Sequence, residues 1–331
     1  MSSGYPTVSV IVPAYNRAHL IGRALESLRR QTYRDFEVVL GDDGSTDDTI
    51  AVAQKAWPEL KVARLPVNRG ASSARNAAIR ASSGHFLAFL DSDDEWLPEK
   101  LAVHMDYLHR HPEVAVCACA YRKQWRDGRS TLVPAPHPED LTEALHSALD
   151  FHGASTPVVR REVLDEVGFQ DEELRILEDW DWMLRISQHH RIEVLDEPLA
   201  IIHENNPSPP DRMRDSTVIF LAKHDADFRR YGAAHRSRVI SQQWENSAFN
   251  MFEHGRPCEG LRLLLRSLRH APLRNPASAV LVPLGAIDAA AGTSFARMLL
   301  AWRGAARQTA RGMRQAEYRD AAKRNNESPL L

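Results

Sequence analysis

Residues 8–17 read VSVIVPAYNR, a β-branched run that Pro13 closes and a polar loop follows. Beyond the loop, apolar residues recur at helical spacing, at positions 20, 21, 24, 25 and 28. This order predicts a buried strand, a loop and an amphipathic helix. The unit then repeats, with strands expected at residues 36–40, 60–65 and 86–90. Helices are expected between them, from Ser45 or Thr46 to about Ala56 and over residues 71–81.

Alternating strands and helices of this length predict an α/β fold with a mostly parallel sheet and helices on both faces. Ligands of such sheets bind at the carboxyl ends of the strands. Polar residues are concentrated at those ends in this chain, at Asn16, Asp42, Asp43, Asp91 and Asp93. We therefore expect the functional site on that edge of the sheet.

The later part of the chain is less regular. A helix is expected after Pro98, and residues 125–153 are expected to form a turn and a surface segment. A strand is expected at 114–121, and order is expected to return at residues 155–159. A short helix ending near Gly168, a helix over 178–189, and a strand pair at 192–195 and 199–203 are expected after it. Prolines between residues 206 and 211 mark a boundary, and only helices are expected beyond it. Three parts follow, residues 1–124, 125–210 and an α-helical extension over 211–331.

The charge balance separates two parts of the chain. The 331 residues include 42 Lys and Arg against 44 Asp and Glu, which gives no reason to expect nucleic acid as a partner. Residues 229–331 hold 17 basic and 7 acidic side chains, net +10, so the other residues carry a net charge of −12. The two parts are expected to meet different partners.

The cysteine content and the apolar pattern indicate a cytoplasmic protein. Three cysteines are too few for a disulfide framework, and Cys117 and Cys119 are expected to be small core residues. Neither a signal peptide nor an apolar run of about 18 residues is expected from the sequence.

An amphipathic basic helix is expected in the extension. Leucines at 261, 264, 265 and 268 line one side and arginines at 262, 266 and 269 the other, and an apolar stretch at 279–291 and five arginines between 297 and 314 follow. Three interpretations stay open: packing on the catalytic domain, a homo-oligomer interface, or peripheral contact with the cytoplasmic face of a membrane.

Two acidic clusters end two strands of the expected sheet, Asp42-Asp43-Gly44-Ser45 and Asp91-Ser92-Asp93-Asp94. Gathered carboxylates raise each other's pKa, and a cation relieves the repulsion. Carboxylate oxygens completed by diphosphate oxygens suit Mg²⁺ or Mn²⁺ rather than zinc. The alternative is that these residues cap the next helices, which suits residues 42–48 well.

Three further features each have a functional and a structural interpretation. Arg75 lies one turn into the helix that follows Asn68-Arg69-Gly70, where it would grip a phosphate or project into solvent. Glu178 and Asp179 open a helix, where acidic residues favour the dipole. His203 ends an apolar run, a position at which a scaffold histidine is more common than a ligand. Spacing alone does not separate these interpretations.

Taken in order, these motifs resemble those of glycosyltransferase family 2, the inverting nucleotide-sugar transferases of GT-A fold. The resemblance covers about residues 7–204. It rests on five motifs in register: VSVIVPAYNR (8–17), DDGSTD (42–47), NRGASSARN (68–76), DSD (91–93) and EDWD (178–181). Five motifs together are far more specific than any one of them.

The resemblance implies a role for each matched position. Tyr15 would lie against the nucleotide base, and Asp43 would accept a hydrogen bond from it. The implied nucleotide-sugar-binding set is Pro13, Tyr15, Asn16, Asp42, Asp43, Arg75, Asp91 and Ser92. The implied metal ligands are Asp93, Asp91 and, as in some members of the family, His203. Asp179 would be the general base, with Glu178 as the less favoured choice.

The implied reaction moves a sugar from a nucleotide-sugar, with a UDP-sugar as the first choice, to an acceptor hydroxyl of a glycan, glycolipid or polymer. Mn²⁺ or Mg²⁺ would offset the charge on the leaving nucleoside diphosphate. A non-catalytic saccharide- or partner-binding protein on the same fold is one alternative. A Rossmann-type cofactor enzyme is another, weakened because the first strand turn, PAYNR (13–17), has no Gly-x-Gly-x-x-Gly.

Overall fold

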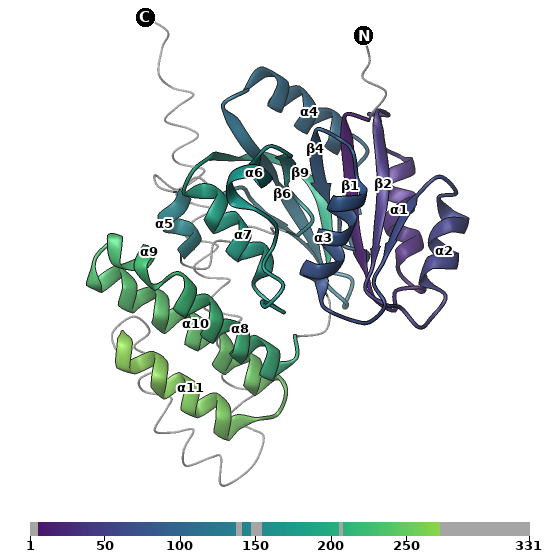
Figure 1. The fold of residues 1–331 in the computed structure, drawn as a ribbon. Helices are drawn as coiled ribbons and strands as arrows, with labels where there is room; N and C mark the ends of the chain where they lie inside the picture. Colours follow the sequence, from purple (N-terminus) through teal and green to yellow (C-terminus); the bar gives the residue numbers. More distant parts are fainter. Residues whose placement is uncertain (1–5, 137–140, 147–153, 205–207, 272–331) are drawn as a thin grey trace, which may run out of the picture. The chain divides into compact units, whose positions relative to one another are not determined.

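The computed structural model describes residues 6–136, 141–146, 154–204 and 208–271 (Figure 1). The chain forms two compact units. The first comprises the chain up to residue 206 together with residues 215–232, and the second comprises residues 207–214 and those from 233 onward. The three-part division expected at residues 124 and 210 stays a prediction.

The first unit is built on a sheet whose strands, in the described residues, follow the order β3-β2-β1-β4-β8-β6-β9-β5, with β7 paired to β6. The strands are β1 (Val8–Ala14), β2 (Phe36–Asp42), β3 (Lys61–Arg64), β4 (Phe86–Phe89), β5 (Glu95–Trp96), β6 (Val114–Gln124), β7 (Ser130–Val133), β8 (Val158–Arg160) and β9 (Arg191–His203). β1 to β4 are parallel, and so are β6 and β9, whereas β8 is antiparallel to both β4 and β6. The expected α/β fold with a mostly parallel sheet is confirmed.

Helices flank this sheet on both faces (Figure 1). The helices before residue 206 are α1 (Ile21–Arg29), α2 (Thr49–Ala56), α3 (Ala71–Ala81), α4 (Lys100–Arg110), α5 (Leu141–His146), α6 (Val163–Val167) and α7 (Glu178–Ser187). The first unit also includes α9 (Asp225–Arg230) and the part of α8 (Pro210–Lys223) from residue 215 onward. The periodic patterns of residues 20–28, 71–81 and 178–189 therefore predicted α1, α3 and α7.

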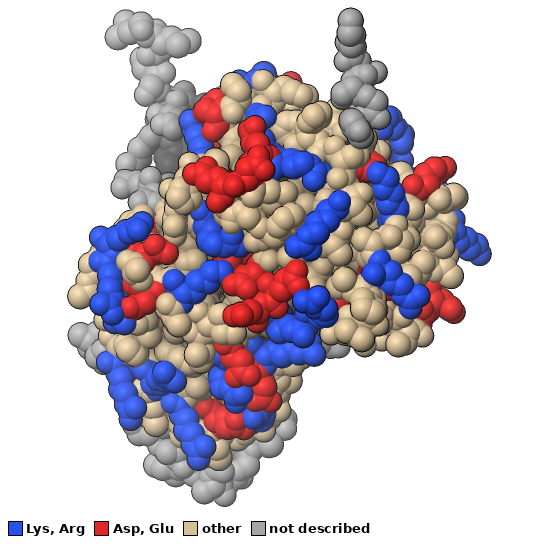
Figure 2. Space-filling view, viewed as in Figure 1, with Lys and Arg blue, Asp and Glu red and all other residues tan. Residues whose placement is uncertain are grey.

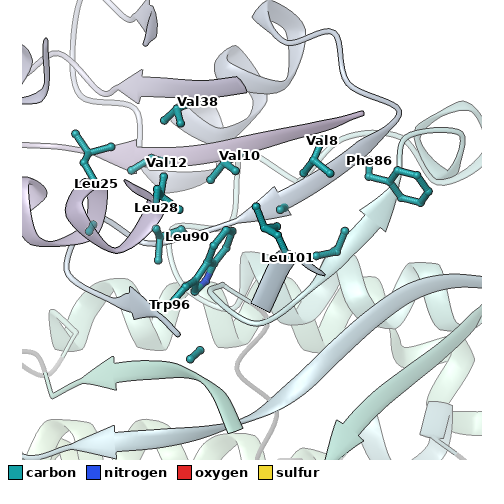
Figure 3. Close-up of a cluster of buried hydrophobic side chains, with 14 of the residues drawn as sticks. Val8, Val10, Val12, Leu25, Leu28, Val38, Phe86, Leu90, Trp96 and Leu101 are labelled. Carbon is teal, nitrogen blue, oxygen red and sulfur yellow. The ribbon is translucent and has the colours of Figure 1, made fainter. Parts of the chain in front are cut away.

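Alternation along β1 gives the sheet two buried faces. Val8, Val10 and Val12 pack in one core with residues of α1 and α4, among them Leu25, Leu28 and Leu101 (Figure 3). Helix α3 covers the opposite face and approaches β2 at Gly41, where a Cβ atom would lie only 2.2 Å from the carbonyl oxygen of Ala74. The small residues of this helix thus have a packing role.

Two expectations for the irregular part were wrong. Residues 192–203 form one strand, β9, which pairs with β6 through register shifts near Ala120 rather than as a strand pair. Such a shift accommodates Pro198, which cannot donate to a regular ladder. Residues 125–153 are not only surface segment, since they contain β7 and α5. Cys117 and Cys119 are buried in β6, as expected.

The second unit contains α10 (Ala233–Glu253) and α11 (Pro257–His270), the helix predicted from the leucine pattern. Leu264 of α11 packs on Ala248, Phe249 and Phe252 of α10. The apolar stretch at 279–291 and the arginines after it lie outside the described residues. Among the helices that are described, none combines the length and the apolar character needed to span a bilayer.

Candidate active site

An acidic turn, residues 91–94, follows β4 at the carboxyl edge of the sheet. The backbone amide of Asp94 donates to the carbonyl of Asp91 across it, at 3.1 Å. Carboxylate oxygens of Asp91, Asp93 and Asp94 all lie within 4.8 Å of one another. Burial raises the pKa of Asp94 well above its usual value, and the charges of Asp91 and Asp93 add to this. The acidic turn therefore concentrates three carboxyl groups that repel one another when ionised.

The residues of the acidic turn fit a hard divalent cation. The donor atoms are carboxylate oxygens, which Mg²⁺ and Mn²⁺ prefer, and no sulfur lies among them. One cationic neighbour, Arg17, has its Nη2 atom 3.9 Å from Asp93 Oδ2, but its side chain is 41% exposed and gives weak compensation. A cation would relieve the mutual repulsion of these carboxylates.

Arg75 connects the acidic turn to helix α7. Its side chain is 3% exposed, and its guanidinium donates to Asp91 Oδ1 at 2.7 Å and to Glu178 Oε1 at 2.8 Å. Burial alone would lower the pKa of Arg75, but the two carboxylates outweigh it and raise the pKa. Of the two interpretations made from sequence, solvent exposure is wrong. The structure brings together two motifs that lie far apart in the chain.

Glu178 and Asp179 lie in the first turn of α7. Burial raises the pKa of Glu178 to about 7; the guanidinium of Arg75 opposes this rise, and the charge of Asp179 adds to it. The preceding residue, Leu177, has a left-handed backbone with φ of 71°, a conformation that costs energy for a branched side chain. Backbone strain thus lies directly before the two acids.

Asp181 anchors the same helix from its buried side. Its carboxylate accepts hydrogen bonds from His224 Nε2 and Arg185 Nε, both at 2.9 Å, and pairs with Lys223 Nζ at 2.8 Å. Against its burial, these three donors lower the pKa of Asp181 to about 2. Sequence reasoning assigned Asp181 no role, because its partners His224 and Lys223 follow more than 40 residues later.

The loops after β1 and β2 are tied together. Asn16 has a left-handed backbone with φ of 53°. Its side-chain Oδ1 accepts the backbone amide of Thr46 at 2.9 Å, and its backbone amide donates to Ser45 Oγ at 3.0 Å. Pro13 is buried in β1, whereas the Tyr15 side chain is 41% exposed. An aromatic face is therefore available beside an ordered loop.

Asp42 and Asp43 hold the neighbouring segments. Asp43 accepts the amides of Arg69 and Gly70 at 2.7 and 2.8 Å, and its burial raises its pKa. Asp42 Oδ2 accepts the amide of Ser45 at 3.1 Å, while its buried Oδ1 has no hydrogen-bond partner in the described residues. Asp43 therefore does not cap the helix that follows it, α2, as the structural interpretation expected; its two oxygens hold the loop before α3.

His203 does not join the group of three carboxylates. Its Nε2 atom lies 2.9 Å from Glu95 Oε1, and its backbone amide donates to Asp94 Oδ1 at 2.9 Å. Ser92 is buried within the acidic turn. Metal binding by His203 and donor binding by Ser92 stay predictions. The motif alone assigns Asp94 no role, whereas in the structure Asp94 lies in the carboxylate group.

The outer face near α3 and α7 carries paired charges. Figure 2 shows acidic side chains gathered there with basic ones around them. Glu172 pairs with Arg69 at 3.1 Å, and Asp171 pairs with Lys223 at 2.6 Å. These pairs connect the loop before α7 to the loop before α3 and to the end of α8.

Comparison with known proteins identifies this arrangement. Residues 9–168 match the family described as glycosyl transferase family 2. An uncharacterized glycosyltransferase of Haemophilus influenzae is 32% identical over 55% of this chain and 62% of its own length. A chondroitin synthase of Pasteurella multocida is 30% identical over 61% of this chain and 21% of its own length. The chain thus spans less than two thirds of these relatives.

Two solved structures share the fold. The complex of S. aureus TarS residues 1–349 with UDP-GlcNAc has a TM-score of 0.53 and 21% identity, over 80% of this chain and 91% of that one. The mannosyltransferase PcManGT of Pyrobaculum calidifontis, in complex with GDP-Man and Mn²⁺, has a TM-score of 0.50 and 23% identity. The match covers 92% of this chain and 81% of that one. The fold is the GT-A type expected from sequence.

A further relative is matched over about two thirds of its own length. TuaG of Bacillus subtilis, a candidate teichuronic acid biosynthesis glycosyltransferase, is 32% identical over 50% of this chain and 67% of its own length. With that extent of similarity and the motifs assembled on one edge of the sheet, the chain belongs to glycosyltransferase family 2.

Proposed function

We propose that the protein is a metal-dependent, inverting glycosyltransferase that moves a sugar from a nucleotide-sugar, with UDP-sugars as the first choice, to an acceptor hydroxyl. The observation that carries the proposal is the position of Arg75. Its partners lie 16 and 103 residues away in sequence, one in the acidic turn and one beside Asp179. A cation-binding and a base-bearing motif therefore meet at one buried arginine.

The donor would bind across the carboxyl edge of the sheet. Tyr15 is exposed and suited to stack on a nucleotide base, and Asn16 holds its loop against Thr46. The solved complexes of TarS and PcManGT contain UDP-GlcNAc and GDP-Man, which supports a nucleotide-sugar as the donor class.

Asp91 and Asp93 would hold the divalent cation, Mn²⁺ or Mg²⁺. When bound, the cation would offset charge on the leaving diphosphate, an effect of roughly 4 kcal/mol per unit charge pair at about 4 Å and a dielectric constant near 20. Arg75 keeps Asp91 in place and adds a fixed positive charge beside it. The presence of Mn²⁺ in the PcManGT complex supports this choice of metal.

Asp179 would take the proton of the attacking hydroxyl. Glu178 is the less suitable base, because its Oε1 atom already accepts from Arg75 at 2.8 Å. A positioned carboxylate base contributes about 10² to 10⁴ in rate. Direct displacement of the diphosphate by the hydroxyl inverts the anomeric centre, since no covalent intermediate intervenes.

The acceptor is proposed as a glycan, a glycolipid or a polymer. Chondroitin synthase and TuaG, among the relatives, are named for polymer synthesis. Contact of the basic extension with a membrane or with a second copy of the chain stays an expectation, because residues 272–331 lie outside the described residues.

A panel of ligands tests the proposal. Thermal unfolding is measured with UDP-, GDP- and CMP-sugars, each with Mn²⁺ or with EDTA, and with NAD and S-adenosylmethionine as rivals. We expect stabilisation by one class of nucleotide-sugar in Mn²⁺ only, because a ligand of the folded state raises the midpoint by mass action. A shift with NAD or S-adenosylmethionine instead would favour the Rossmann-type alternative.

A further inference from the structure

Ser155 lies behind the acidic turn, and no motif indicated it. The residue is fully buried in the segment that leads into β8. Its hydroxyl donates to Asp94 Oδ2 at 2.6 Å and accepts the backbone amide of Asp91 at 3.0 Å. One side chain therefore contacts both ends of the four-residue turn.

The other oxygen of Asp94 is also engaged. Oδ1 accepts the backbone amide of His203, at the end of β9, at 2.9 Å. Asp94 thus connects the turn to the segments before β8 and at the end of β9, and both of its carboxylate oxygens accept from the protein. Ser155 binds the side chain of Asp94 but not the carboxylates of Asp91 and Asp93.

Ser155 is itself held rigidly. Its carbonyl accepts Nε1 of Trp96 at 2.8 Å, and the next carbonyl, of Thr156, accepts Nζ of Lys100 at 2.9 Å. The Lys100 ammonium lies 4.3 Å from the Trp96 ring centroid, and both side chains are buried. A buried ammonium is uncommon, and here it fixes two consecutive residues of the backbone.

We infer that Ser155 is a positioning residue for the metal site: it fixes the spacing of the acidic turn so that Asp91 and Asp93 face the cation. This inference rests on the proposed function, because it requires that the turn bind metal. Groups that orient the ligands of a metal raise its affinity, and their loss costs about 10- to 100-fold. We expect that range of weakening without Ser155.

Ser9 supplies a matched control. It is also a fully buried serine, and its hydroxyl donates to Glu37 at 2.7 Å and accepts the amide of Gly84 at 2.8 Å. It thus makes the same two kinds of hydrogen bond, but near the amino end of β1, on the edge opposite the site. Ser9→Ala should lower stability to a similar degree and leave the metal site intact.

The experiment measures Mn²⁺ binding directly. Free Mn²⁺ is quantified by electron paramagnetic resonance in the presence of UDP, for the parent, Ser155→Ala, Ser155→Cys, Ser155→Thr and Ser9→Ala. We expect the alanine and cysteine variants at Ser155 to bind Mn²⁺ about 10- to 100-fold more weakly. Ser155→Thr, which keeps the hydroxyl, should recover much of the affinity, and Ser9→Ala should match the parent.

Hydrogen exchange gives a readout that needs no metal. The amide of Asp91 donates to Ser155, so a peptide covering residues 88–98 should exchange faster in Ser155→Ala than in Ser9→Ala. If the parent binds Mn²⁺ and Ser155→Ala binds it as tightly as Ser9→Ala does, the inference is overturned and the proposed function stands. If the parent binds no Mn²⁺, both are overturned.

Discussion

Replacement of Arg75 by methionine gives the most quantitative prediction. Methionine keeps most of the volume and removes the charge, leaving Asp91 and Glu178 without their common partner. Their side chains are 25% and 12% exposed, so water replaces only part of the lost interaction. We therefore expect a large loss of folding free energy.

The magnitude follows from the two ion pairs. A unit charge pair at about 4 Å is worth roughly 4 kcal/mol at an effective dielectric constant near 20, and desolvation of the arginine offsets part of the sum. Removal of one partner from a buried pair costs about 3–5 kcal/mol in practice. We expect about 4 kcal/mol at pH 8, a large fraction of a typical stability of about 5–15 kcal/mol.

The loss should depend on pH in a defined direction. The pKa of Glu178 is raised from 4.5 to about 7 in the folded protein, so its contribution is most favourable below pH 4.5 and is lost as the pH rises through 7. Without Arg75 the folded-state pKa rises further. The deficit of Arg75→Met should therefore be smaller at pH 5.5 than at pH 8.

Urea unfolding followed by tryptophan fluorescence measures the effect. Arg80→Met is the control on the same helix, since the Arg80 side chain is 56% exposed and its pair with Glu172 spans 3.9 Å; we expect a change within about 1 kcal/mol. Arg75→Met/Glu178→Gln should recover part of the loss, because one uncompensated charge is removed. A cost below about 1 kcal/mol for Arg75→Met at pH 8 would refute the reasoning.

Three further variants test other parts of the site. Asp179→Asn should keep UDP affinity, but the formation of UDP from the donor, with water or an acceptor as nucleophile, should slow by about 10²-fold or more. Near-normal turnover would place the base elsewhere. Asp181→Asn should cost about 2 kcal/mol of folding free energy at pH 7 in urea unfolding, because the pKa of Asp181 is lowered from 3.8 to about 2. This stabilisation is present above pH 3.8 and is lost as the pH falls through 2. An equal cost at pH 2 would contradict the assignment. Tyr15→Ala should weaken UDP binding by about 1–3 kcal/mol in calorimetry without lowering the unfolding midpoint, since the side chain is 41% exposed; unchanged affinity would remove Tyr15 from the base site.

Local pattern was sufficient to predict the first part of the fold. β1 is a short β-branched run and α1 has a periodicity of about 3.6, so the two are distinguished from sequence, and the motif loops begin where the strands end. β9 was misjudged because Asp196, Glu197 and Pro198 interrupt its apolar run. The shift in register against β6 accommodates these residues within one strand. Register depends on both strands, so the sequence of β9 alone does not predict it.

The burial of Arg75 and the roles of Asp181 and Ser155 could not be predicted. Sequence leaves Arg75 with two interpretations, a phosphate ligand or a solvated helix residue, because its partner Glu178 follows 103 residues later. Ser155 lies where order is expected to return after a surface segment, and its contact with Asp94 spans 61 residues. The motifs locate the site in the sequence, whereas the side chains that hold the motifs in place are defined by long-range packing.

Calorimetric titration of UDP into the parent and into Asp93→Ala, each with Mn²⁺ and with EDTA, tests the central claim most directly. Asp93 offers a carboxylate to the cation, and it is buried in the acidic turn, where its charge repels that of Asp94. Its loss removes that repulsion and should leave the unfolding midpoint close to that of the parent. We predict saturable binding to the parent in Mn²⁺, much weaker binding in EDTA, and loss of the metal-dependent part in Asp93→Ala. Equal UDP affinity of the parent in Mn²⁺ and EDTA, or an Asp93→Ala variant with the parent's metal-dependent affinity, would contradict the account.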